Sequence, residues 1–157
     1  MTNIHDWSGY VTEHRFDSGL SKRDERLGLL IWFRLSRAYG RSLKESHRHL
    51  KQWGLTAAQF DVLAQVGAHD RLTQQQLAEK LFVTKGNITQ LLGKLEELGL
   101  VKREQTWKHK YVSLTERGKE LYADVVPVQE QFQASRFGAL SREEKKRLLE
   151  LLKKIQE

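Results

Sequence analysis

The segment LTQQQLAEKLFVTKGNITQLLGKLEELG, residues 72–99, constrains the fold more than any other part of the chain. Thr73 and Thr84 each begin a run in which apolar residues recur every three to four positions, as the N-cap residues of two amphipathic helices do. Between the runs there is room only for a tight turn. Small Ala78 allows the second helix to approach the first closely, and Val83 fills the turn. The pattern therefore predicts a helix-turn-helix.

The second of these helices, predicted over residues 84–98, has two very different faces. Ile88, Leu91, Leu92 and Leu95 form an apolar stripe, whereas the opposite face has glycines and short or polar side chains, which would let the helix enter a DNA major groove about 12 Å wide. Amide side chains can pair with adenine, a threonine methyl can touch thymine, and the N–H groups at a capped helix start favour a phosphate. The predicted DNA contacts of this helix are Thr84, Lys85, Gly86, Asn87, Thr89, Gln90 and Lys94.

Residues 100–115 change to an alternating pattern around a short polar centre at residues 105–108, which predicts a β-hairpin. Basic side chains near its turn could lie over the DNA backbone or in the minor groove. The predicted contacts of this wing are Arg103, Lys108, His109 and Lys110. An amphipathic helix with a polar face is the usual surface helix, so the basic hairpin after it is what favours DNA binding.

The remainder of the chain has helical patterns. A long amphipathic helix is predicted from about Asp24 to Trp53, with apolar positions that include Leu27, Leu30, Ile31, Leu35, Ala38, Leu43 and Leu50. Thr56 and Thr115 are N-caps of further helices, and Pro127 is expected to kink the second of these. Ser141 and Glu144 form a capping box that opens the last helix. The predicted fold class is mainly α with a small β-hairpin wing.

With these motifs in place, the sequence resembles the MarR family of winged helix-turn-helix transcriptional regulators over residues 27–156. The segments GLTAAQFDVL, LTQQQLAEKLFVTKGNITQLLGKLEELGLVKR and VSLTERGKEL carry the resemblance. It implies an intertwined homodimer in which each protomer presents a recognition helix and a wing to half of a pseudo-palindromic operator. It also implies a repressor that is released by a small, commonly aromatic, acid.

The resemblance divides the chain into an N-terminal arm (1–23), a dimerisation helix (24–54), a DNA-binding domain (55–115, with the helix-turn-helix at 74–98 and the wing at 100–115) and C-terminal dimerisation helices (116–157). The wing departs from the family pattern. Family wings carry an Asp-Arg pair near the tip, whereas this one reads EQTWKHK, and Lys108 or Lys110 could take the place of the arginine. Trp107 could fold back on the hairpin, which we favour, pack on sugar and phosphate, or touch the partner.

Composition narrows the class of function. The 27 basic and 20 acidic residues give a net charge of +7 and a pI near 9.7, which suits a polyanionic partner, and the charge is not gathered in a tail. The absence of cysteine excludes thiol chemistry. There is no Gly-x-Ser-x-Gly elbow, phosphate-binding loop or His-Glu-x-x-His helix, so no enzymatic role is predicted. Without a membrane span or signal peptide, the protein is expected in the cytoplasm of a bacterium or archaeon.

Aromatic and cationic side chains of the first helix could bind an aromatic carboxylate, because a ring suits apolar walls and a cation takes the acid. The predicted effector-pocket residues are Trp32, Tyr39, Arg41, His47 and Trp53, for which core or interface packing is the alternative. His47 and His49 diverge on a helix and cannot chelate together, so no metal or other cofactor is predicted. The alternative functions are a winged-helix protein-interaction module and a metal-responsive regulator.

Overall fold

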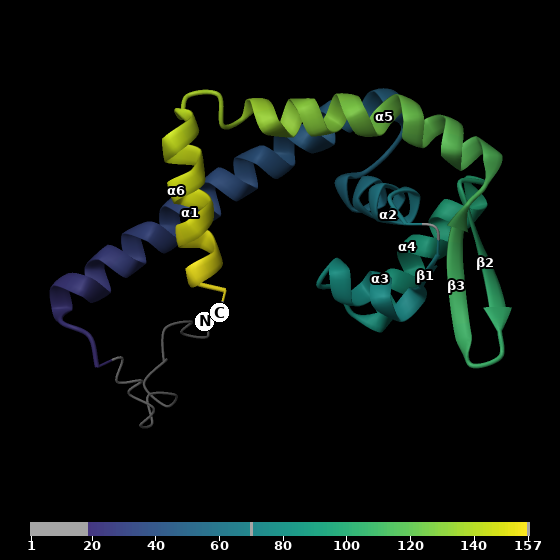
Figure 1. The fold of residues 1–157 in the computed structure, drawn as a ribbon, viewed down its shortest axis with the longest axis horizontal. Coiled ribbons are helices and arrows are strands. Elements are labelled where there is room, and N and C mark those ends of the chain that lie inside the picture. Colours follow the sequence, from purple (N-terminus) through teal and green to yellow (C-terminus); the bar gives the residue numbers. More distant parts are fainter. Residues whose placement is uncertain (1–18, 70, 157) are drawn as a thin grey trace, which may run out of the picture. The chain divides into compact units, whose positions relative to one another are not determined.

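The computed structural model describes residues 19–69 and 71–156. It confirms a mainly helical chain with a β-hairpin (Figure 1). The elements are α1 (Lys22–Leu50), the 3-10 helix η1 (Lys51–Trp53), α2 (Ala57–Gly67), β1 (Leu72–Thr73), α3 (Gln74–Lys80), α4 (Lys85–Glu97), β2 (Val101–Thr106), β3 (His109–Leu114), α5 (Glu116–Ser135) and α6 (Arg142–Lys154). The chain divides into two units between Tyr39 and Gly40, within α1. In the part of the chain that is described, no helix has the length and apolarity to cross a membrane.

Side-chain caps start the helices at the residues that the sequence predicted. The hydroxyls of Thr84 and Thr115 accept hydrogen bonds from the third backbone N–H of α4 and α5, and such a cap contributes about 1 kcal/mol. Three further helices begin with a reciprocal capping box, which satisfies two backbone N–H groups at once. These boxes are Thr56 with Gln59, Thr73 with Gln76 and Ser141 with Glu144.

Three helical segments end in the same left-handed turn. Gly54, Phe82 and Gly99 have φ angles of +67°, +53° and +69°. In each case two backbone hydrogen bonds close the turn; for Phe82 they run from its N–H to Glu79 O (3.2 Å) and from Val83 N–H to Ala78 O (3.0 Å). This is the Schellman motif, whose left-handed residue is usually glycine. The turn of the helix-turn-helix is therefore a helix cap with phenylalanine in the glycine position.

The sheet has three antiparallel strands in the order β1-β3-β2, one more than the predicted hairpin. β1 has two residues, too few to show a period in the sequence. Thr106 pairs with His109, so the turn contains Trp107 and Lys108 alone and is tighter than the polar centre that the sequence predicted. The hairpin projects from the helices with this turn at its free end (Figure 1).

The buried core lies between α2, α3, α4, α5 and the sheet. The predicted stripe of α4 is confirmed: Ile88, Leu92 and Leu95 are fully buried, and Leu91 packs against them at the edge. Leu77 of α3 is fully buried as well. The inward face of α4 is therefore occupied, and its other face is left free to bind a partner.

The junction between the wing and α5 explains the segment VSLTERGKEL. The Thr115 hydroxyl donates to Gly99 O (2.6 Å) and accepts from Gly118 N–H (3.0 Å), while Thr115 N–H donates to Leu100 O (3.1 Å). A Cβ at position 118 would lie 1.9 Å from Leu100 O, so glycine is required there. This junction fixes the base of the wing against the first turn of α5.

The C-terminal part of α1 is tied to α5. His49 Nδ1 donates to Oε1 of the fully buried Gln129 (2.6 Å), and the His49 ring stacks on Phe132 with 4.4 Å between centroids. Arg136 and Glu45 form an ion pair of 2.6 Å. α5 continues through Pro127 as one helix.

The apolar positions predicted for the first half of α1 are not buried. The side chains of Leu27, Leu30, Ile31 and Leu35 are 37–58% exposed, although Leu50 near the end of the helix is fully buried. Leu149 and Leu151 on α6 and Ile155 at its C-cap are exposed too. These residues repeat at helical spacing but are not covered by the described part of their own unit, so the periodicity alone did not show where their partner lies.

Candidate nucleic-acid interface

The polar face of α4 is exposed as predicted. Lys85, Asn87, Gln90 and Lys94 are all exposed, and their backbone is set by the Thr84 cap. Gly86 and Gly93 lie on the same helix, and a Cβ would clash at neither position: at Gly86 it would lie 4.0 Å from the Thr84 hydroxyl oxygen, an ordinary contact, and at Gly93 it would meet no atom within 4 Å. Glycine destabilises an exposed helix by about 1 kcal/mol relative to alanine. Packing within the described chain does not require glycine at either position, so it does not explain this cost. The close approach of a bound partner to the helix backbone would explain both glycines.

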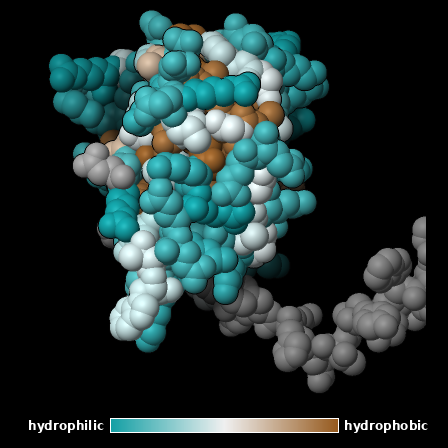
Figure 2. Space-filling view, turned by 90° about the vertical axis from the view of Figure 1, so that its right-hand side faces the viewer, coloured by the Kyte–Doolittle hydropathy of each residue, from teal (hydrophilic) through white to brown (hydrophobic). Residues whose placement is uncertain are grey.

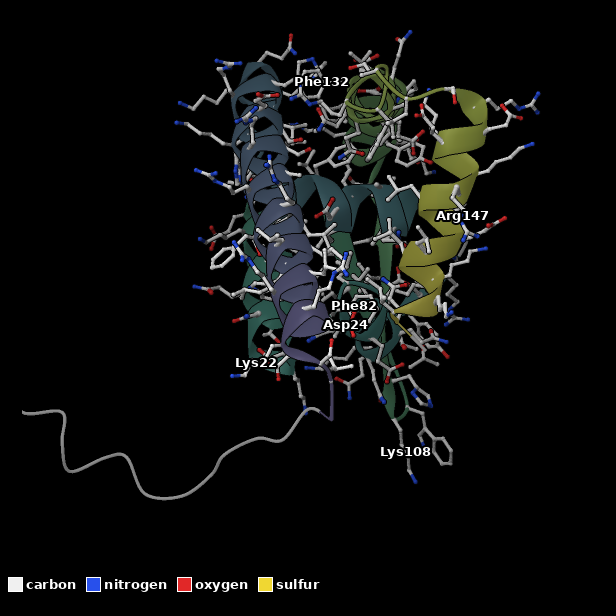
Figure 3. All side chains as sticks on the ribbon, turned by 90° about the vertical axis from the view of Figure 1, so that its left-hand side faces the viewer. Lys22, Asp24, Phe82, Lys108, Phe132 and Arg147 are labelled. Atoms are coloured by element: carbon white, nitrogen blue, oxygen red, sulfur yellow. The ribbon has the colours of Figure 1, made fainter. Side chains whose placement is uncertain are left out.

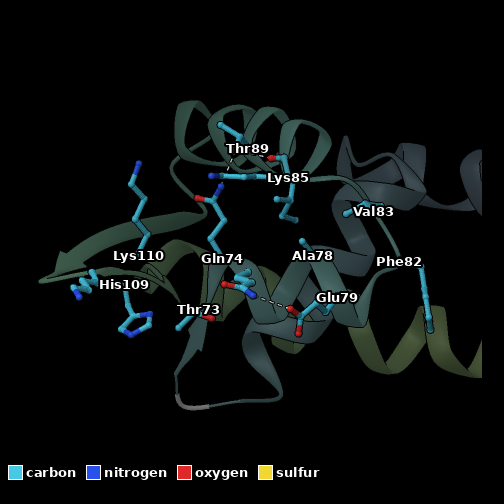
Figure 4. A pocket seen from close by; sticks show the side chains of 13 residues that line it. Thr73, Gln74, Ala78, Glu79, Phe82, Val83, Lys85, Thr89, His109 and Lys110 are labelled. Carbon is cyan, nitrogen blue, oxygen red and sulfur yellow. Dashed lines mark hydrogen bonds between the residues drawn. The ribbon is translucent and has the colours of Figure 1, made fainter.

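Thr89 differs from its neighbours because its hydroxyl is already engaged. It donates to Lys85 O (2.8 Å) and accepts from Nε2 of Gln74 (2.7 Å), which reaches across from the start of α3 (Figure 4). Oε1 of Gln74 is buried without a hydrogen-bond partner among the described residues. The methyl group of Thr89 is therefore the part of its side chain that is left for a base contact. Gln74 becomes part of the candidate interface, beside the exposed face of α4. The run of three glutamines at residues 74–76 is the feature of the sequence that could have indicated the place of Gln74 in this interface.

A cleft of about 790 Å³ runs between α3, α4 and the wing (Figure 4). Its lining includes Lys85 and Thr89 from α4 and three predicted wing residues, Lys108, His109 and Lys110. The face of the molecule that bears the hairpin is mostly hydrophilic in its lower part, with apolar atoms showing between polar ones higher up (Figure 2). The structure therefore brings α4 and the cations of the outer wing to one cleft, whose lining also includes the apolar side chains of Ala78, Phe82 and Val83 and the carboxylate of Glu79.

Arg103 is placed differently from the other predicted wing residues. Its Nε donates to Glu96 Oε1 at 3.0 Å and its Nη2 donates to Glu96 Oε2, so the guanidinium and the carboxylate form a two-point ion pair. The hydrogen bond from Arg103 lowers the pKa of the Glu96 carboxyl, and the same bond raises the pKa of Arg103. In this arrangement Arg103 fixes the base of the wing to the end of α4, and it does not offer a free cation.

A second contact that the sequence did not predict steadies the outer wing. The guanidinium carbon of Arg71 lies 3.7 Å from the centroid of the Tyr111 ring, a cation–π distance, and its Nη2 donates to the Thr106 hydroxyl at 3.4 Å. Arg71 precedes β1, so it can be placed beside the hairpin only after the third strand is known. Its charge adds to the basic character of the wing.

The tip of the wing is open to solvent. Trp107 is 85% exposed, so the expected fold-back onto the hairpin does not occur. The Nζ atom of Lys108 lies 5.3 Å from the centroid of the indole. Lys108 itself extends from the free end of the hairpin (Figure 3).

Of the five predicted effector-pocket residues, three line depressions of the second unit. Arg41 and His47 line a depression along the end of α1, whereas Trp53 lines a different one, near Leu98 and Arg117. Trp32 and Tyr39 are exposed and belong to the first unit. Among residues 19–69 and 71–156 there is no group of three or more histidine or acidic side chains that could hold a metal ion.

Comparison with known proteins identifies the family. The MarR family model matches residues 53–110, from η1 to the outer wing. An uncharacterized HTH-type transcriptional regulator of Bacillus cereus is 46% identical over 134 residues, which cover 85% of this chain and 91% of that protein. The chain belongs to the MarR family. As a MarR-family protein it is a helix-turn-helix transcriptional regulator, and neither the family nor its named relatives are described as enzymes.

Solved structures agree with this membership. The MepR protein of S. aureus, in a crystal structure with DNA, matches with a TM-score of 0.74 and 25% identity over 79% of this chain and 94% of MepR. MarR from E. coli in its apo form matches with a TM-score of 0.65 and 26% identity over 82% of this chain and 96% of MarR. The winged helix-turn-helix fold of this MarR-family chain is thus shared with both.

Proposed function

We propose that this MarR-family regulator is a homodimeric repressor that binds a pseudo-palindromic operator, with α4 in the major groove and the wing beside it. The observation that carries the proposal is the shared surface of the two elements. Lys85 and Thr89 from α4 line one cleft with Lys108, His109 and Lys110 from the outer wing, on a protein with a net charge of +7. Lysine contacts to phosphate supply affinity, and Asn87 and Gln90 supply discrimination between bases.

The glycines of α4 support an approach that is close enough for base contacts. With no side chain at positions 86 and 93, the helix backbone can lie nearer to the groove floor than an alanine-bearing helix could. MepR, which has the same fold at 25% identity, was crystallised with DNA. The two arguments are independent, because one rests on the residues of this chain and the other on its relatives.

The exposed apolar residues of α1 and α6 support the dimer. A helix that is apolar on several sides is normally buried, and these residues are exposed in the described part of their own unit. A second copy would supply it and would set two recognition helices on successive half-sites. A dimer bound at a promoter would block access of RNA polymerase, so a role as a repressor is proposed. Release by a small aromatic acid stays a prediction, for which the depressions lined by Arg41 and His47 and by Trp53 give no direct support.

Replacing Gln90 with alanine tests the base-reading role. We expect specific binding to weaken by about 1–3 kcal/mol, because an amide pair with adenine is lost, while binding to unrelated DNA stays nearly unchanged. The measurement is fluorescence anisotropy with labelled operator and with scrambled DNA at one fixed salt concentration.

Gln131→Ala is the matched control, since Gln131 is also an exposed helical glutamine but lies on α5. It should change neither affinity. If Gln90→Ala lowered both affinities equally, Gln90 would contribute to general attraction only, and the proposed base reading by α4 would be wrong at this position.

A further inference from the structure

Trp107 has an uncommon backbone conformation for a large side chain. Its φ angle is +56°, and it is the first of the two residues that connect β2 to β3. When this turn position has positive φ, glycine is preferred, because a Cβ is strained there. With the indole 85% exposed, no burial within the described chain offsets the strain. A strained, exposed aromatic residue at the end of a hairpin is more readily explained by binding than by folding.

The surroundings of Trp107 indicate what it binds. Residues 105–110 include Lys108 and Lys110 and contain no carboxylate. Both lysines and His109 line the cleft that α4 shares, so the tip lies on the side of the recognition helix. Arg71 holds the hairpin through its contacts with Tyr111 and Thr106. The indole is therefore presented by a steadied, cationic strand pair toward the polyanion that α4 is proposed to bind.

We propose that Trp107 is a minor-groove contact whose indole lies edge-on between the sugars that flank each half-site. This inference rests on the proposed DNA-binding function. The indole has apolar faces for deoxyribose carbons and one N–H donor, which matches the acceptors that A·T pairs present in the minor groove. A G·C pair adds the guanine 2-amino group, a donor that stands in the way. Trp107 thus makes the wing selective for A·T over G·C at pairs that α4 does not read.

The test compares wild-type protein and Trp107→Ala on one operator, obtained by selection, with three kinds of flanking pair: A·T, G·C and inosine·C. Inosine lacks the 2-amino group, so it resembles adenine in the minor groove but guanine in the major groove. We expect the wild type to bind the A·T and inosine·C operators equally and the G·C operator about tenfold more weakly. Trp107→Ala should bind all three alike, near the affinity of the wild type for the G·C operator.

Two results would overturn the assignment. If Trp107→Ala kept the preference of the wild type, the indole would not be its source. If Trp107→Ala bound all three operators more weakly by the same factor and still preferred A·T, the contact would lie outside the groove floor. A wild type that bound no selected operator would instead contradict the DNA-binding function itself, so the two failures are distinguishable.

Trp107→Gly separates binding from folding. Glycine suits the turn, so this variant should have a midpoint of thermal unfolding at least as high as that of the wild type, and yet lose the preference for A·T flanks. A lower midpoint accompanied by wild-type DNA binding would show that Trp107 serves the hairpin and not the DNA.

Discussion

At the scale of single residues, Phe82 has the same local structure as Gly54 and Gly99, but unlike glycine it cannot adopt a positive φ without strain. All three close a helix in the left-handed conformation, and the Phe82 side chain is 97% exposed. A phenylalanine in this conformation is strained by about 1–2 kcal/mol, and packing within the described chain offsets little of that. The strain lies in the turn that sets the angle between α3 and α4.

Phe82→Gly is therefore expected to raise the free energy of unfolding by about 0.5–1 kcal/mol, the relief of strain less the entropy that glycine adds to the unfolded chain. Urea unfolding followed by circular dichroism measures it. Gly99→Ala is the converse control and should destabilise the protein by about 1–2 kcal/mol, because it places a Cβ in the same conformation. A less stable Phe82→Gly would mean that the phenyl ring has a packing partner in the assembled protein.

At the scale of elements, the wing is fixed to the helices at its base and open at its tip. Thr115 and Gly118 join its base to α5, and the Glu96–Arg103 ion pair joins it to α4. The sequence predicted the hairpin correctly, and the DNA contacts of its basic residues stay a prediction. It could not show that Arg103 is paired, because the geometry that brings Glu96 to it arises only when the strand crosses the end of the helix.

The ion pair gives the stability a pH dependence. The pKa of Glu96 is lowered from 4.5 in the folded state, so its contribution is fully present above 4.5 and is lost as the pH falls through the folded pKa. We expect Glu96→Gln to be less stable than the wild type by about 0.5–1 kcal/mol at pH 7, and the difference to shrink at lower pH. Urea unfolding at a series of pH values measures both.

Glu97→Gln serves as the control for this series, since Glu97 is exposed and no ion pair is described for it within residues 19–69 and 71–156. The Glu97→Gln variant should have the same free energy of unfolding as the wild type across the series. A difference between Glu96→Gln and wild type that stayed constant down to low pH would show that the Glu96 charge is not what stabilises the wing.

At the scale of the whole molecule, the periodicity of the sequence predicted which segments are helical but not where their apolar faces are buried. The stripes of α3 and α4 lie in the core, whereas that of α1 before Tyr39 and that of α6 are exposed. The two kinds of stripe look alike in sequence, because burial within a chain and burial in the proposed dimer demand the same spacing. The two-residue strand β1 and the Arg71 contact also escaped prediction, since both depend on long-range pairing.

The dimer can be tested through α6. Replacing Leu151 and Ile155 together with aspartate should give a monomer in sedimentation velocity, because charges would enter the apolar interface. Lys146→Asp with Lys153→Asp changes the opposite face of the same helix and should leave the dimer intact. A Leu151/Ile155 variant that sedimented as the wild-type dimer would remove α6 from the interface.

The central claim is that a dimer of this MarR-family chain reads a specific DNA sequence, and selection from random DNA fragments by the purified protein, followed by sequencing, tests it most directly. We predict an enriched pseudo-palindrome whose half-sites are about one helical turn apart. Salt-sensitive binding with no enriched sequence would contradict base reading by α4 and would favour a role as a protein-interaction module.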